Sequence, residues 1–152
     1  MSAEQVCTFS VATNTFGVPV SLVQEVIRSL EITPVPLAPV AVSGMLNLRG
    51  QIVTAIDLRT RLKFDARPEA KSPMHVVVRT PDGPISLLVD DVGEVIEMDS
   101  ERISAPPETM DAGAREMVTG VYQLPERLLL VLDVARAADL SKAQSAPGGQ
   151  RG

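Results

Sequence analysis

Short apolar runs with alternating polar positions, separated by turn-forming residues, recur along most of this chain of 152 residues. Valine and isoleucine are frequent, and 10 glycines and 12 prolines interrupt the apolar runs. Period-two alternation bounded by such residues is typical of short β-strands joined by tight turns. The pattern therefore predicts an all-β fold. The predicted strands are Gln5–Val11, Phe16–Val20, Val42–Leu48, Gln51–Ile56, Met74–Arg79, Ile85–Val89, Val118–Gln123 and Leu128–Leu132.

The chain also repeats itself. GMLNLRGQIVTAIDL, residues 44–58, returns 76 positions later as GVYQLPERLLLVLDV, residues 120–134, without a gap. VQEVI, residues 23–27, returns at an offset of 69 as VGEVI, residues 92–96, so the later half holds a seven-residue insertion. We infer two copies of one unit, and because each copy is small, the halves are expected to share a core. A duplicated small barrel offers a groove between its halves, which suits binding, and no reactive side chains repeat.

Each copy is predicted to hold a β-hairpin followed by a short helix. Arg49 and Gly50 form the first hairpin turn, in which the glycine can supply positive φ. Residues 125–126 take the same place in the second copy. Asp57 and Asp133 stand where helix N-caps belong, ahead of LRTRL and VARAADL. The two strands at the start of the chain are expected to open the first barrel.

The segment Ser21–Leu30 carries two conflicting signals. It opens with a capping-box signature, and its apolar residues recur at helical spacing. Its repeat partner contains a glycine and β-branched residues, which favour a strand. We therefore predict one helical turn at Ser21–Gln24 and then a strand running toward Ile32. Three prolines between residues 34 and 39 exclude a helix interior or a central strand, so that stretch is predicted to be a surface connection.

Composition narrows the possible partners and the compartment. The net charge of −5, from 14 basic and 19 acidic residues, disfavours nucleic acid and anionic lipid. No apolar run approaches the roughly 20 residues that span a bilayer, and the amino terminus lacks the features of a signal peptide, so a cytosolic protein is expected. Cys7 is expected to be a buried thiol rather than a reactive one. Residues 1–140 are expected to form the folded domain, and residues 141–152, rich in glycine, proline, serine and glutamine, a disordered tail.

Candidate catalytic chemistry is sparse, and neither a metal nor a cofactor is expected. His75, the single histidine, is expected to be an ordinary surface or edge residue. Asp90 and Asp91 would face opposite sides of a strand, so solvation at a turn or edge is expected for them rather than a shared metal. Arg59, Arg61, Lys63 and Arg67 are expected to form a solvated helix face.

One polar run allows two interpretations. Asn47 and Arg49 lie at the predicted hairpin tip, where the second copy keeps the apolar frame but changes the polar residues. These side chains could serve only the turn and the solvent, or they could recognise a partner, because hairpin tips commonly carry recognition. Glu25 is similarly open, since it could simply pair with Arg28.

The order VQEV at residues 23–26, NLRG at residues 47–50 and DLR at residues 57–59 resembles the CheW family of bacterial chemotaxis coupling proteins. The resemblance runs from about Val6 to Leu140. It implies two five-stranded SH3-like β-barrels with short helices and a shared hydrophobic junction. This agrees with the fold class that the repeat and the strand pattern favour.

The resemblance also implies a function without catalysis. CheW-like proteins are adaptors that join the cytoplasmic tips of methyl-accepting chemotaxis receptors to the regulatory domain of the histidine kinase CheA, which itself looks like CheW. On this basis the partner-binding residues are expected to include the tip and its surroundings, with valines of the second half lining an apolar groove. The candidates are Val23, Glu25, Gly44, Asn47, Leu48, Arg49, Gly50, Val89, Val92, Val95 and Gly120.

Three alternatives remain open from the sequence. The chain could serve a non-flagellar chemosensory pathway, such as twitching motility, surface sensing or development. A small enzyme using His75 and an RNA-binding double barrel using Arg59, Arg61 and Arg67 are the two readings from other classes.

Overall fold

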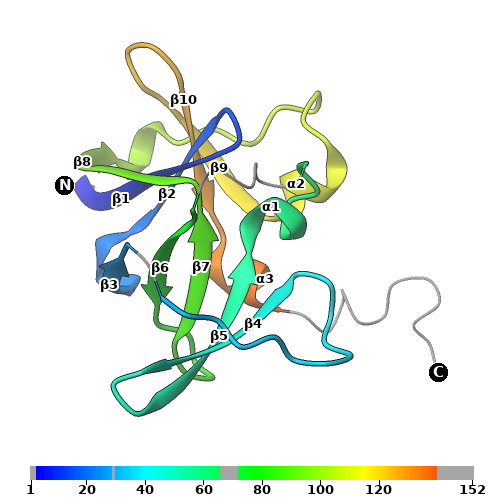
Figure 1. The fold of residues 1–152 in the computed structure, drawn as a ribbon. Coiled ribbons are helices and arrows are strands. Elements are labelled where there is room, and N and C mark those ends of the chain that lie inside the picture. The colour runs from blue at the N-terminus through cyan, green and yellow to red at the C-terminus, as the bar shows by residue number, and fades with distance from the viewer. Residues whose placement is uncertain (1–2, 29, 66–71, 140–152) are drawn as a thin grey trace.

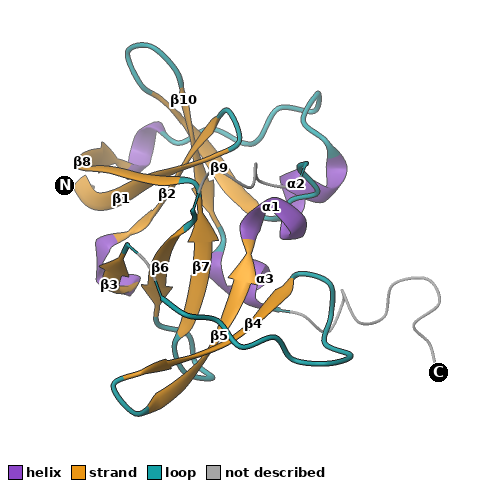
Figure 2. Ribbon diagram, in the orientation of Figure 1, coloured by secondary structure: helices purple, strands orange, loops and turns teal. Residues whose placement is uncertain are grey.

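In the computed structural model, residues 3–28, 30–65 and 72–139 are described, and they form two five-stranded sheets with a few short helices (Figures 1 and 2). The strands are β1 (Ala3–Val11), β2 (Asn14–Pro19), β3 (Val23–Ile27), β4 (Val42–Leu48), β5 (Gln51–Asp57), β6 (Met74–Val78), β7 (Ile85–Val89), β8 (Asp91–Asp99), β9 (Val118–Gln123) and β10 (Leu128–Leu132). The helices are α1 (Leu58–Arg61), α2 (Ala112–Glu116) and α3 (Val134–Ala138), with 3₁₀ turns η1 (Val20–Leu22) and η2 (Ser100–Arg102).

The predicted all-β class is confirmed, and most strand bounds agree within two residues. The turn before β3 is present as η1, but β3 ends at Ile27 rather than continuing toward Ile32. Asp57 and Asp133 cap α1 and α3, as predicted, through side-chain oxygens that accept backbone N–H groups. Helix α2 was not predicted. The predicted tail, residues 141–152, lies outside the described residues, as does Arg67.

The two halves of the chain exchange hairpins. One sheet has the order β3-β6-β7-β5-β4, which we call barrel I, and the other has the order β8-β1-β2-β10-β9, which we call barrel II. Hairpin β1–β2 of the first half therefore completes the barrel of the second half, and hairpin β6–β7 does the reverse. Figure 1 shows barrel II above barrel I. The expectation that β1 and β2 open a barrel built from their own half is wrong, because β2 pairs in parallel with β10.

Each barrel closes through an isolated bridge next to a glycine. Thr33 bridges to Met45 in barrel I, and Ser104 bridges to Val121 in barrel II. A Cβ on Gly44 would lie 2.3 Å from the Thr33 carbonyl oxygen, and one on Gly120 would lie 2.3 Å from Ile103 Cγ2. Only glycine permits these approaches, so the two matching glycines of the repeat have a structural role inside the chain.

Buried apolar side chains form one shared core and one small core in each barrel. The shared core includes Phe9, Phe16, Ile56 and Leu132, which come from both barrels. Leu46 and Val53 belong to the core of barrel I, and Met98 and Leu129 to that of barrel II. The expected shared hydrophobic junction is therefore present. Cys7 is buried in it, as predicted, and burial raises the pKa of its thiol.

Candidate partner-binding surface

The β4–β5 hairpin ends in a tight turn that presents a charged side chain. Arg49 and Gly50 both have positive φ, 54° and 88°, as a two-residue hairpin turn of the primed type requires. Asn47 Oδ1 accepts a hydrogen bond from the Gly50 N–H at 2.7 Å, which stabilises the turn. Leu48 is buried in the core of barrel I and anchors the tip. The turn therefore rests on a fixed base while the side chain of Arg49 is 71% exposed.

Arg49 reaches from this turn to β3 and pairs with Glu25. The guanidinium donates to both carboxylate oxygens, with Nη1 to Oε2 at 2.5 Å and Nη2 to Oε1 at 2.6 Å. This hydrogen-bonded pairing lowers the pKa of Glu25. The sequence interpretation that Glu25 could pair with Arg28 is wrong, because barrel closure brings β3 beside the β4–β5 turn. The two candidate residues thus form one exposed, bidentate charged group.

The remaining candidates differ widely in exposure. Val23 and Val92 are half-buried, and each packs against the shared core. Val89 is fully buried in that core, whereas Val95 is 55% exposed. Gly44 and Gly120 are buried at the bridges that close the barrels. Among these residues, only Val95 presents a large apolar surface to a partner.

Val95 belongs to a set of exposed apolar residues whose other members, Val26, Ile52 and Leu128, the sequence analysis missed. Val26 on β3 is 40% exposed and Ile52 on β5 is 61% exposed. Their equivalents in the repeat are Val95 and Leu128, which are 55% and 43% exposed. Both barrels therefore expose apolar side chains at the same two positions. Aligning the repeat by residue would have paired them, but strand alternation alone did not indicate which positions the shared core leaves exposed.

The tips of the two barrels are not equivalent. Where barrel I has the Glu25–Arg49 pair, the repeat places Glu94 and Pro125, so no matching pair forms in barrel II. A groove of about 510 Å³ lies beside Pro125, and Ile96, Tyr122 and Leu124 contribute its apolar lining. The chain therefore offers two related surfaces, one crossed by a charged pair and one open.

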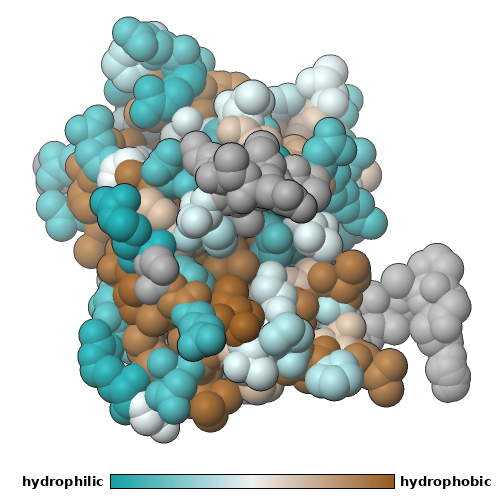
Figure 3. Space-filling view, in the orientation of Figure 1, coloured by the Kyte–Doolittle hydropathy of each residue, from teal (hydrophilic) through white to brown (hydrophobic). Residues whose placement is uncertain are grey.

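Further apolar surface lies on barrel I. Figure 3 shows brown atoms over the middle of the lower barrel and on the loop that joins β3 to β4. On that loop Leu37 and Val40 are almost fully exposed. The predicted surface connection around the three prolines is thus confirmed.

His75 is not the surface or edge residue that the sequence predicted. It lies on β6, between β3 and β7, and is 1% exposed, with Nδ1 3.0 Å from Ser86 Oγ. The repeat places Val6 and Gly17 at the same positions of barrel II. The buried pair in barrel I thus replaces an apolar contact in barrel II, and burial lowers the pKa of His75.

This burial predicts a pH-dependent stability. The unfolded chain takes up a proton at His75 near its ordinary pKa of about 6.5, whereas the folded chain resists protonation. The free energy of unfolding should therefore be highest above that pH and fall as the pH drops below it. In the double variant His75→Val and Ser86→Ala, urea unfolding between pH 5 and 7 should lack this component. An unchanged pH slope would show that His75 does not titrate with folding.

Two further expectations about charged residues are wrong. Asp90 is not solvated but 5% exposed, and it pairs with Arg59. Arg61 donates to the backbone carbonyls of Ala137, Arg136 and Asp139 at the end of α3. Folding places Asp90 beside Arg59 and backbone carbonyls beside Arg61. These two arginines therefore do not form a solvated face.

Within the described part of the chain, no group of three or more histidine, cysteine, aspartate or glutamate residues could hold a metal ion. Among the same residues, no helix is long and apolar enough to cross a membrane.

Comparison with known proteins gives a consistent result. The family model of the CheW-like domain matches residues 5–142. A chemotaxis protein CheW of Treponema pallidum is 27% identical over 86% of this chain and 79% of that protein. Its counterpart in Klebsiella aerogenes is 28% identical over 84% of this chain and 77% of that protein. The crystal structure of the scaffolding protein TtCheW from Thermoanaerobacter tengcongensis superposes with a TM-score of 0.81 at 28% identity, covering 91% of this chain and 94% of that one. With a family match over nearly its whole length and the same double-barrel fold, this chain belongs to the CheW-like domain family.

Proposed function

We propose that this chain is a non-enzymatic adaptor that couples transmembrane chemoreceptors to a CheA-type histidine kinase. Its partners are the regulatory domain of the kinase and the cytoplasmic tip of a methyl-accepting receptor. In this role it works in the cytoplasm at receptor arrays on the inner face of the membrane, where it supports array assembly and kinase control. Family membership and the architecture of the two barrels support this proposal.

The observation that carries the proposal is the pair of related but unequal surfaces. Val26 and Ile52 on barrel I match Val95 and Leu128 on barrel II in position and exposure. Burial of exposed apolar surface is the main favourable term in most protein–protein association. Only barrel I adds the Glu25–Arg49 pair. An adaptor that holds two different partners needs two such surfaces.

The geometry disfavours the two readings from other classes. His75 and Ser86 are 1% and 0% exposed, so a substrate does not reach them. Arg59 and Arg61 donate their hydrogen bonds to Asp90 and to backbone carbonyls, which removes them from contact with RNA phosphates.

Arg49→Glu tests the proposal. The change places a carboxylate beside Glu25, so the tip loses its pair and gains repulsion, while the fold should persist because the side chain is exposed. We expect a loss of affinity of at least tenfold, about 1.4 kcal/mol, for one of the two partners. Binding to the kinase regulatory domain and to a receptor-tip fragment from the same genome would be measured by titration calorimetry.

Lys63→Glu is the matched control, since it makes the same charge change at an exposed residue after α1. It should leave both affinities unchanged. If Arg49→Glu binds both partners as tightly as the unsubstituted chain, the proposal that the hairpin tip contacts a partner is wrong. If the folded, unsubstituted chain captures neither partner, the adaptor function itself is wrong.

A further inference from the structure

The chain crosses from barrel I to barrel II at a single buried residue. Asp90 stands alone between β7, the last strand that the chain contributes to barrel I, and β8, which belongs to barrel II. Its backbone N–H donates to the Ser10 carbonyl oxygen of β1 at 2.9 Å. Because no loop intervenes, the backbone leaves the two barrels little freedom to move at this crossover. Contacts of the Asp90 side chain can restrict that movement further.

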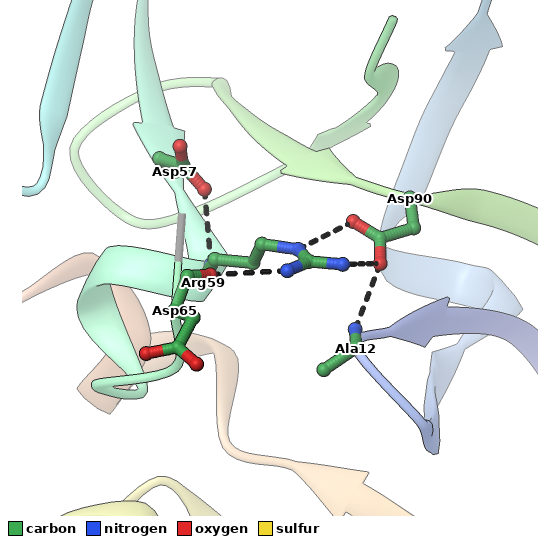
Figure 4. A network of polar contacts seen from close by, with 5 residues as sticks. All are labelled: Ala12, Asp57, Arg59, Asp65 and Asp90. Carbon is green, nitrogen blue, oxygen red and sulfur yellow. Dashed lines mark hydrogen bonds and ion pairs between the residues drawn. The ribbon is translucent and has the colours of Figure 1, made fainter. Parts of the chain in front are cut away.

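The Asp90 carboxylate is held from both barrels, as Figure 4 shows. Arg59 on α1, which follows β5 of barrel I, donates from Nε to Oδ1 at 2.9 Å and from Nη2 to Oδ2 at 2.5 Å. Ala12, in the β1–β2 turn of barrel II, donates its backbone N–H to Oδ2 at 2.8 Å. One carboxylate thus joins a helix of barrel I to a hairpin turn of barrel II.

Arg59 is itself fixed by two contacts within its own segment. Its backbone N–H donates to Asp57 Oδ1 at 3.0 Å, and its Nη1 donates to the Asp65 carbonyl oxygen at 3.0 Å. The side chains of Arg59 and Asp90 are 12% and 6% exposed, so water competes little for the pair. Removing one partner would leave a buried charge uncompensated.

The second crossover between the barrels lacks this arrangement. It runs from β2 to β3 through η1, where the repeat places Ser21 at the position of Asp90 and Ala135 at that of Arg59. There, Arg79 donates to the carbonyl oxygens of Ser21 and Val23 at 3.2 and 3.1 Å, in exposed hydrogen bonds. Of the two crossovers, the one at Asp90 is held by a buried ion pair. The one at η1 is held by hydrogen bonds at the surface.

We propose that the Arg59–Asp90 pair is a positioning device that fixes the angle between barrels I and II at the β7–β8 crossover. Without it, the angle that the shared core allows between the barrels would be less narrowly fixed at that crossover. The consequence for binding rests on the proposed function: the two surfaces are then presented in one relative orientation, which suits simultaneous engagement of two partners. Arg59 and Asp90 act through the barrels and do not themselves contact a partner.

The test is the distribution of distances between two spin labels, one on each barrel. Asp82→Cys in the β6–β7 turn and Glu126→Cys in the β9–β10 turn are exposed attachment points, and the buried Cys7 should stay unlabelled. Pulsed electron–electron double resonance on the full chain should show one narrow distribution of distances between the two labels. Asp90→Ala should broaden or shift it, and Asp90→Asn, which keeps an acceptor for Ala12 but loses the charge, should do so less.

Leu129→Ala is the control for a general loss of stability, because it removes packing from the separate core of barrel II without touching the pair or the core shared by the barrels. It should leave the distribution narrow. An unchanged distribution in folded Asp90→Ala would overturn the proposal. If that variant does not fold, Arg59→Lys, which keeps the charge but not the two-point geometry, decides by the same readout. The measurement needs no partner, so its failure is distinct from failure of the adaptor function.

Discussion

Ile56→Ala should lower the free energy of unfolding by about 2–5 kcal/mol, and Leu132→Ala should have a similar effect. The two residues are equivalents in the repeat and are 0% and 2% exposed. Both lie in the core shared by the barrels, where a truncated side chain leaves a cavity that the opposing barrel cannot easily fill. Chemical unfolding monitored by circular dichroism measures the effect.

The matched controls lie four residues earlier on the same strands. Ile52→Ala on β5 and Leu128→Ala on β10 change the same residue types at exposed positions. They should alter stability by less than about 0.5 kcal/mol. The adaptor proposal adds that they weaken partner binding, which the core variants, once folded, should not. Equal destabilisation at positions 52 and 56 would contradict the finding that the shared core covers Ile56 and leaves Ile52 exposed.

Gly44→Ala should destabilise the protein by about 3 kcal/mol or more, at the upper end of the effects of overpacking. The added Cβ would meet the Thr33 carbonyl carbon and oxygen, which are backbone atoms that cannot rotate away. The φ of Gly44, 152°, adds strain for any other residue. We expect the Thr33–Met45 bridge to open, with faster amide hydrogen exchange at both residues.

Gly50→Ala separates the two causes. Its φ is also positive, 88°, but no atom lies within 4 Å of an added Cβ. It should therefore cost only the conformational penalty, about 1–2 kcal/mol. If Gly44→Ala costs no more than Gly50→Ala, the close approach at Thr33 does not limit barrel closure.

Local sequence patterns were sufficient to predict the strands and the turn of the β4–β5 hairpin. The turn at Arg49–Gly50 and the N-cap at Asp57 depend on neighbouring residues, so the sequence predicted both. The repeat likewise predicted that Gly44 and Gly120 are equivalent. It did not indicate that each glycine packs closely against another segment of the same chain. The opposing residue lies in an irregular connection after the preceding strand, and local patterns do not place such a residue.

Contacts between distant residues were not predictable in this way. For Glu25 the sequence left open a pairing with the nearby Arg28, whereas barrel closure brings it to Arg49. His75 and Asp90 were assigned to solvent because a polar residue without a visible partner is most often exposed. Their partners, Ser86 and Arg59, become adjacent only when the strands pair.

The sequence by itself determined the all-β class, the duplication, the hairpin tip and the resemblance to the CheW family, because each depends on residues close together or on a repeated order. The tertiary structure alone decided the exchange of hairpins between the halves, the ion pair at the crossover and which apolar residues remain exposed. These depend on which strands pair across the whole chain, and period-two alternation is compatible with more than one such pairing.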